Sequence, residues 1–114
     1  MGGAMQPLGH AQIVINLIDF DMNLQEAGDA PRFRHVGSSQ PTGEKMTDGG
    51  FLICENGFDQ NEISKIKEIG HKVVNQNEDD YMKGAFGGYQ AIMIKEGVLY
   101  GASESRKDGH ASGY

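Results

Sequence analysis

The feature that most constrains this chain is an apolar segment with helical periodicity near its N-terminus. Apolar residues recur at spacings of three and four from Leu8 to Met22, and a second apolar stripe runs beside them. A helix that is apolar on most of its circumference is expected to be a central helix, covered by other elements. Pro7 suits the first turn, where a missing N–H costs nothing, so Gly2 and Gly3 lie at or just outside the helix N-terminus.

Turn and capping signals divide the rest of the chain into short elements. Asn23 and Glu26 have the spacing of a capping box before a second helix, which Pro31 ends, and Asp59 and Glu62 repeat that spacing before a third helix. The expected elements are a helix over 24–30, an extended segment over 32–36, a polar loop over 36–44, strands over 44–46 and 51–55, a helix over 59–69 ending at Gly70, a strand over 71–75, a loop over 77–88, and a hairpin with strands over 89–94 and 98–102.

Length and charge limit what the chain can be. Its 114 residues fit a single domain, residues 1–114. The net charge of −6 argues against nucleic acid and against a membrane surface, because phosphate-binding faces need concentrated Lys and Arg. No targeting signal or membrane span is visible, since the first basic residue is Arg32 and Asp19 and Asp21 interrupt the apolar run. The compartment stays unknown, because a signal peptide further upstream would not appear in this chain.

The sequence has no pattern typical of a metal or cofactor site. The single cysteine, Cys54, lies in the apolar stretch Phe51–Cys54 and is expected to be buried as a small hydrophobic residue. The glycines of residues 84–88 lack the lysine and hydroxyl of a phosphate-binding loop. The histidines lack the close spacing of metal ligands, so we predict no metal and no cofactor. The histidines are His10, His35, His71 and His110.

Gly2 and Gly3 can do chemistry through their backbone. Successive glycines let two N–H groups point the same way with no side chain in front of them, and a following helix adds the positive end of its dipole. Such a pair of donors suits an oxyanion that develops during a reaction. Without further context, a flexible terminus or a cloning remnant is the favoured explanation of these glycines.

Two long motifs, one at each end of the chain, resemble the gamma-glutamyltransferase family. The first begins with the glycine pair and continues into a segment of the form NLxEAxxAPRFRH. The second ends the chain at Gly-Tyr. The matching residues are Gly2–Gly3, Met5–Pro7, Gly9–His10 and Asn23–His35 at one end, and Leu99–Ser103 and Arg106–Tyr114 at the other.

The resemblance implies the fold and the place of this chain within it. Members of that family are N-terminal-nucleophile hydrolases, in which a proenzyme cleaves itself and exposes a threonine at the start of a small subunit. This chain would be the C-terminal part of that subunit. The expected fold class is α+β, an incomplete part of a four-layer αββα sandwich.

The resemblance also implies a reaction and a role for the glycine pair. The threonine attacks a gamma-glutamyl amide, its own amine serves as base, and the acyl-enzyme passes to water or to an amino acid. In the family, a glycine pair at the position of Gly2 and Gly3 supplies N–H groups to the oxyanion. We therefore predict that Gly2 and Gly3 form the oxyanion hole of such an enzyme.

The chain departs from the family pattern in ways that limit this prediction. Thr42 and Thr47 are its only threonines, and neither resembles the family's cleavage site. The nucleophile is therefore expected to lie outside this chain, and the 114 residues alone are expected to be inactive. Asp21 stands where the family usually has glycine, and Glu104-Ser105 replaces its usual Asp-Pro. The substrate stays open between glutathione, poly-gamma-glutamate and an acylated beta-lactam.

The expected partners follow from the same resemblance. They are a large subunit and a nucleophile-bearing segment upstream, with a gamma-glutamyl-type small molecule as substrate. The isolated chain is expected to self-associate, because it has few elements with which to cover its apolar helix. The alternative is a stand-alone, noncatalytic binding module that keeps the fold, and the gene sequence upstream of Met1 would distinguish the two.

The arginines of the first motif have a structural interpretation. Arg32 and Arg34 alternate with Phe33 on the segment expected to be extended. We predict that they form ion pairs with acids such as Glu26 or Asp29 rather than contact substrate.

Overall fold

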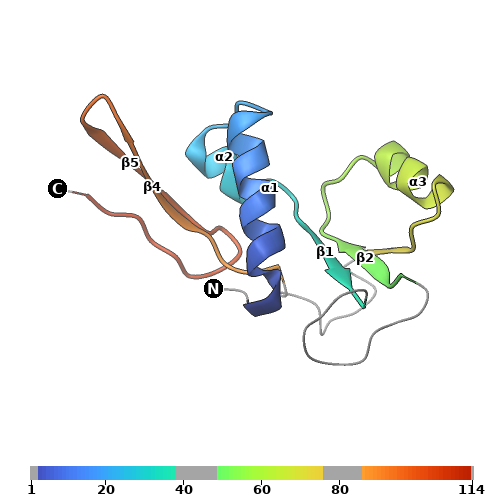
Figure 1. Ribbon diagram of the computed structural model, residues 1–114. Helices are drawn as coiled ribbons and strands as arrows, with labels where there is room; N and C mark the ends of the chain where they lie inside the picture. The colour runs from blue at the N-terminus through green and yellow to red at the C-terminus, as the bar shows by residue number, and fades with distance from the viewer. Residues whose placement is uncertain (1–2, 38–48, 76–85, 114) are drawn as a thin grey trace. The chain divides into compact units, whose positions relative to one another are not determined.

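The computed structural model describes residues 3–37, 49–75 and 86–113, and its helices and strands are labelled in Figure 1. The chain divides into two compact units, the first from residues 1–30 and 87–114 and the second from residues 31–86. The single domain expected over residues 1–114 stays a prediction.

The apolar segment near the N-terminus begins with a short 3₁₀ turn. This turn, η1 (Gly3–Met5), leads directly into helix α1 (Gln6–Ile18), and Pro7 lies in the first turn of α1 as predicted. The prediction that the helix continues to Met22 is wrong. Asp21 has a φ of 51°, a left-handed value that cannot continue an α-helix, and it occupies the position where the family usually has glycine.

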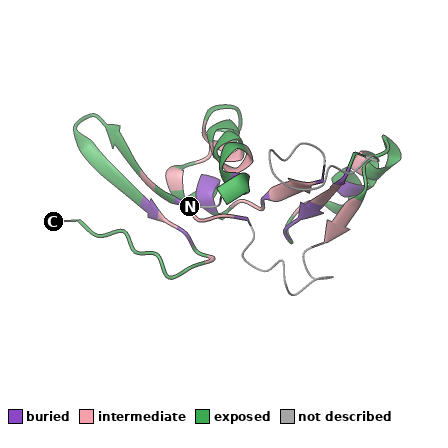
Figure 2. Cartoon of the chain, turned by 60° about the horizontal axis from the view of Figure 1, so that its bottom comes forward, coloured by how far each residue is buried: buried purple, intermediate pink, exposed green. Residues whose placement is uncertain are grey.

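Helix α1 is exposed in this chain, although its composition predicts a covered helix. It contains no buried residue, and the side chain of Ile18 is 73% exposed. Figure 2 shows most of the helix in the colour of exposed residues. The helix packs against α2, which covers only part of an apolar circumference, so the expectation of full cover is wrong for these residues.

Helix α2 (Leu24–Asp29) has the capping box that its sequence predicts. The side-chain oxygen of Asn23 accepts hydrogen bonds from the N–H groups of Gln25 (3.0 Å) and Glu26 (2.9 Å). In return, the carboxylate of Glu26 accepts from the N–H of Asn23 at 2.9 Å. Pro31 follows Ala30, the C-cap residue of α2, at a point where proline cannot continue the helix.

The predicted hairpin belongs to the same unit. Strands β4 (Gln90–Lys95) and β5 (Val98–Ser103) pair in antiparallel register, with Lys95 opposite Val98. Glu96 and Gly97 form the two-residue turn with φ values of 53° and 78°. Positive φ at both central positions is the geometry that suits the twist of a hairpin.

The second unit contains a three-stranded sheet in the order β1-β2-β3. Strands β1 (Phe33–Val36) and β2 (Phe51–Cys54) are antiparallel, whereas β2 and β3 (Val73–Asn75) are parallel. Helix α3 (Gln60–Glu68) connects the parallel pair, as such a crossover requires. The strand expected over residues 44–46, and residues 77–85 of the loop expected over 77–88, lie outside the described residues.

Helix α3 begins and ends where its sequence predicts. The carboxylate of Asp59 accepts from the N–H of Asn61 at 2.7 Å, which caps the first turn. Glu62, the expected second member of a capping box, accepts a hydrogen bond from Lys65 at 2.6 Å. Gly70, with a φ of 103°, ends the helix in the left-handed conformation that favours glycine.

Exposed apolar surface on the first unit leads to a prediction about the isolated chain. Besides Ile18, the hairpin residues Ile92, Ile94 and Leu99 are each about two-thirds exposed or more. We expect the 114 residues to self-associate when they are produced alone, because burying these side chains between copies removes them from water. Sedimentation velocity over a concentration series measures this. A compact monomer at the highest concentration would contradict it.

Candidate functional site

The predicted oxyanion pair lies at the start of η1, and the structure describes one of its two residues. Gly3 has a φ of 49°, in the left-handed region, and among the described residues no atom beyond its chain neighbours lies within 4 Å of the position that a Cβ would occupy. Gly2 lies outside the described residues. The backbone at Gly3 therefore has open space on the side where a side chain would otherwise stand.

The N-terminus of this helix suits an anion. The residue before α1 is Met5, whose side chain carries no capping oxygen and makes no cap hydrogen bond. Because α1 continues directly from η1, the N–H groups that lead this helical segment are those of Gly3 and the residues just after it. Uncapped N–H groups and the positive end of the helix dipole attract negative charge. The arrangement can therefore stabilise an oxyanion, which is the chemistry that the sequence predicts for Gly2 and Gly3.

Contacts within the first unit fix α1 against α2. The side-chain amide of Asn16 donates to the carbonyl of Ala27 at 3.3 Å, and the carbonyl of Asn16 accepts from the N–H of Met22 at 3.0 Å. At the other side of α2, the Tyr89 hydroxyl donates to the carbonyl of Leu24 at 2.9 Å. The helix that follows Gly3 is therefore held by side chains as well as by the chain itself.

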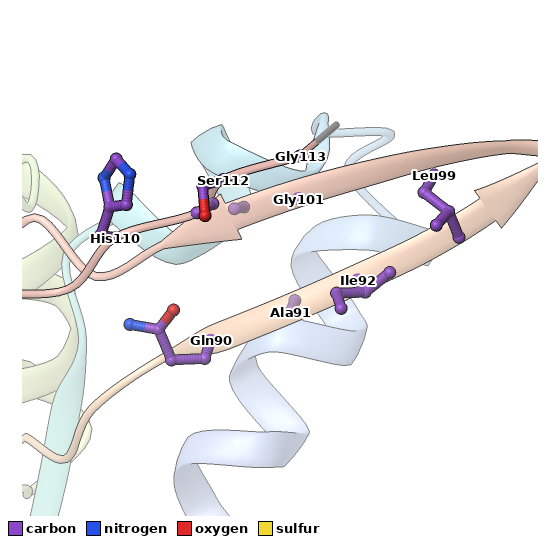
Figure 3. Close-up of a pocket in the computed structure, with 10 residues that line it drawn as sticks. Gln90, Ala91, Ile92, Leu99, Gly101, His110, Ser112 and Gly113 are labelled. Carbon is purple, nitrogen blue, oxygen red and sulfur yellow. The ribbon is translucent and has the colours of Figure 1, made fainter.

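A groove of about 660 Å³ lies between the hairpin and the C-terminal residues 110–113. Figure 3 shows Ile92 and Leu99 on the hairpin and Ser112 on the last segment of the chain. The segment approaches closely because Gly109 has no side chain: a Cβ there would overlap the side chains of Ser103 and Gln90. The sequence analysis missed this groove, whose only signal is the run of small residues near the C-terminus.

The match to known families covers every residue of the chain. The model described as Gamma-glutamyltranspeptidase matches residues 1–114. The chain belongs to the gamma-glutamyltranspeptidase family. This result confirms the family predicted from the motifs at the two ends, and the solved structures of the family confirm the α+β, N-terminal-nucleophile hydrolase fold.

Individual relatives of known name or structure agree with this assignment. The glutathione hydrolase proenzyme of Escherichia coli (strain K12) is 35% identical over 105 residues, which are 90% of this chain and 15% of that protein. The cephalosporin acylase of Bacillus halodurans has a TM-score of 0.77 and 36% identity, covering 100% of this chain and 19% of that one. The structure of an acivicin-inhibited gamma-glutamyltranspeptidase has a TM-score of 0.64 and 28% identity, and the match covers 88% of this chain and 47% of that one. In that protein, the C-terminus has critical roles in autoprocessing and catalysis.

This gamma-glutamyltranspeptidase-family chain spans only a small part of its relatives. It covers 15% of the length of the Escherichia coli relative and 19% of the Bacillus halodurans acylase. The relatives are enzymes, and the Escherichia coli protein is named as a proenzyme. Thr42 and Thr47 lie outside the described residues, so the expectation that neither is the nucleophile stays a prediction.

Arg32, from the first family motif, lies in a buried polar cluster of the second unit. Its side chain donates to the carbonyl of Phe86 at 3.2 Å, and the residue is 3% exposed. Its N–H donates to the carboxylate of Glu55 at 2.8 Å, and the N–H of Glu55 donates back to the carbonyl of Arg32 at 2.9 Å. These contacts give Arg32 a structural role, as the sequence indicates. The ion pairs of Arg32 and Arg34 with Glu26 or Asp29 stay predictions.

Cys54 is buried at the end of β2, as its apolar neighbours predict. Burial raises the pKa of its thiol, and the nearby ammonium of Lys67 lowers it by a smaller amount. A buried, neutral thiol is a poor nucleophile. Cys54 therefore contributes packing rather than reactivity.

The raised pKa of Cys54 leads to a pH-dependence. The folded state holds the thiol proton more tightly than the unfolded state, so this contribution to stability is complete below the ordinary thiol pKa of about 8.5 and is lost as pH rises through the folded value. We expect a disulfide reagent to label the native chain slowly at pH 8 and the urea-unfolded chain rapidly. Because Cys54 is the single cysteine, the colour released reports it alone. Equal labelling rates in both states would contradict this expectation.

Across residues 3–37, 49–75 and 86–113, no group of three or more His, Cys, Asp or Glu side chains could hold a metal ion. Within the same ranges, no helix is long and apolar enough to cross a membrane.

Proposed function

We propose that this chain is the C-terminal portion of the small subunit of a gamma-glutamyltransferase-like enzyme. The enzyme transfers or hydrolyses gamma-glutamyl or related amides through an acyl-enzyme on an N-terminal threonine. The nucleophile and the large subunit belong to sequence outside these 114 residues. Within this chain, the N–H groups of Gly2 and Gly3 stabilise the oxyanion.

The observation that carries the proposal is the backbone at Gly3. Gly3, the described member of the glycine pair that opens the family motif, has a positive φ of 49° and open space beside its Cα, and it begins the 3₁₀ turn that leads into α1. Each of these features favours a backbone donor that an anion can approach. The family match over all residues supplies the reaction in which such a donor is needed.

The reaction divides the work between this chain and the segment that carries the threonine. The hydroxyl of the threonine attacks the amide carbonyl while its free amine accepts the proton, and the carbonyl oxygen becomes negatively charged. The N–H groups at Gly2 and Gly3 donate to that oxygen, so the tetrahedral intermediate is stabilised more than the substrate. Collapse of the intermediate releases the amine product and leaves the acyl-enzyme, which water or an amino acid then accepts.

The names of two relatives support two of the three substrates that the sequence leaves open, and poly-gamma-glutamate stays open as the third. The Escherichia coli relative is named a glutathione hydrolase, whereas the Bacillus halodurans relative is named a cephalosporin acylase. A gamma-glutamyl amide and an acylated beta-lactam both have a carbonyl that a threonine can attack. The choice between them depends on side chains outside this chain.

The exposed apolar surface argues against a stand-alone binding module. Ile18 on α1 and Ile92 on β4 are 73% and 74% exposed, respectively. A small soluble domain that functions alone rarely leaves side chains of this size uncovered on two elements. A larger protein would cover them.

Activity of the chain with and without its expected partner segment tests the proposal. We expect the 114 residues alone to show no turnover of a gamma-glutamyl anilide, because no terminal threonine is present to form the acyl-enzyme. The complete proenzyme is expected to cleave itself and then to release the anilide colour. Turnover by the isolated chain that disappears on changing Thr42 or Thr47 to alanine would overturn the proposal.

A further inference from the structure

The C-terminal carbonyls of α2 are bound by a side chain from the other end of the sequence. The guanidinium of Arg106 donates to the carbonyls of Gly28 at 2.8 Å, Asp29 at 3.3 Å and Ala30 at 2.8 Å. The last carbonyls of a helix have no partner within the helix, and they form the negative end of its dipole. A planar cation with several donors therefore fits this end of α2 better than any neutral side chain would.

Glu104 fixes the orientation of that guanidinium. It is 3% exposed, and its carboxylate accepts from the Arg106 side chain at 2.9 Å and from the Arg106 N–H at 3.3 Å. A buried carboxylate needs such a partner, since an uncompensated charge there would be strongly destabilising. Glu104 therefore holds the guanidinium of Arg106 in place at the end of α2.

A second contact joins the same helix to the end of β5. The side-chain amide of Gln25 donates to the carbonyl of Ser103 at 2.8 Å and accepts from the N–H of Ser103 at 3.2 Å. Its nitrogen also donates to the carboxylate of Asp29 at 3.1 Å. Gln25 thus pairs with the strand backbone much as a neighbouring strand would.

We propose that Arg106 is a positioning residue for the oxyanion donors, and this inference rests on the proposed function. Arg106 and Gln25 attach α2 to the hairpin and the C-terminal segment, and the contact of Asn16 with Ala27 attaches α1 to α2. Gly3 begins η1, which leads directly into α1. When Arg106 is lost, α2 and α1 can shift together, and the donors move away from the place where the oxyanion forms.

The test uses the complete, self-cleaved enzyme with a gamma-glutamyl anilide as probe and an acylated cephalosporin as the second probe. Arg106→Gln is compared with Lys107→Gln, a matched control that removes the same charge from an exposed neighbour. For Arg106→Gln we expect kcat per titrated active site to fall about 10- to 100-fold, the loss typical of a displacement of about 1 Å, with KM unchanged. Arg106→Lys, which keeps the charge, should recover part of that loss, and Lys107→Gln should match the wild type.

The outcomes separate a positioning role from a structural one. A lower melting temperature with normal kcat per active site in Arg106→Gln would overturn the inference, because a purely structural residue changes the amount of folded enzyme and not its rate. If Arg106→Gln does not fold, Arg106→Lys decides by the same comparison of kcat. Gly3→Pro is measured in parallel. If Gly3→Pro is active, or if the wild type cleaves neither probe, the proposed function itself fails. If Gly3→Pro is inactive and Arg106→Gln has a normal kcat, this inference alone is overturned.

Discussion

Gly50→Ala is expected to open the sheet of the second unit. A Cβ at Gly50 would overlap the carbonyl oxygen of Val36 and would lie 2.9 Å from its carbonyl carbon, and both are backbone atoms that cannot rotate away. Gly50 also has a φ of 73°. The left-handed strain costs about 1–2 kcal/mol, and the overlap adds about 1–3 kcal/mol, which together are a large part of the stability of a small domain.

Gly49→Ala is the matched control for this change. Gly49 has a similar φ of 83°, but no atom lies within 4 Å of its Cβ position, so alanine there brings the strain without the overlap. Hydrogen exchange of the β1 and β2 amides measures the difference directly, because these amides exchange through local opening of the sheet. Exchange should be fastest in Gly50→Ala. Equal exchange in the two variants would show that the overlap relaxes at no cost.

The elements that the sequence predicted are those that local chemistry determines. The capping box at Asn23 and Glu26 and the turn at Glu96 and Gly97 each depend on residues at most three positions apart. Such signals can be read from the sequence because donor, acceptor and backbone conformation all lie within one turn of chain. For helix α2 and for strands β4 and β5, each predicted end therefore lies no more than one residue from the observed end.

The predictions from sequence were wrong or incomplete where distant residues or backbone dihedral angles determine the structure. The α1 pattern continues to Met22, but the positive φ of Asp21 ends the helix earlier, and nothing in an apolar periodicity reports that angle. Exposure of α1 depends on which elements are present to cover it, which periodicity does not report either. The binding of Arg106 to Ala30 joins residues 76 positions apart, so no local pattern could have shown it.

The candidate site was predicted in part. The sequence places Gly2 and Gly3 before a helix, and the structure adds the φ of Gly3 and the missing side-chain cap. What holds the donors in place was not predicted, because it depends on the contacts of α2. The family resemblance predicted which residues form the site. The positions of the side chains around α2 indicate which contacts hold those residues in place.

Loss of the Gly3 donor in the complete enzyme is the change with the largest expected effect on rate. In Gly3→Pro the N–H is absent and the ring holds φ at about −65° instead of 49°, so the hydrogen bond from Gly3 to the oxyanion cannot form. Removing one such donor typically lowers the rate by about 100- to 1000-fold. The loss should appear in the acylation step, with little change in substrate binding, because the negative charge develops only in the transition state.

Two further variants measure how far backbone strain alone, with the N–H kept, lowers the rate. Gly3→Ala keeps the N–H, and open space surrounds the added methyl, so its effect comes from the left-handed φ of 49°, at about 1–2 kcal/mol. Gly9→Ala adds the same methyl inside α1, where no atom lies within 4 Å and φ is not positive, and should leave the rate unchanged. Acylation measured by the burst of anilide release should therefore fall steeply in Gly3→Pro, less in Gly3→Ala and not in Gly9→Ala. A folded, self-cleaved Gly3→Pro enzyme with a near-normal burst would contradict the oxyanion role, and the glycine pair would then be only a turn before a helix.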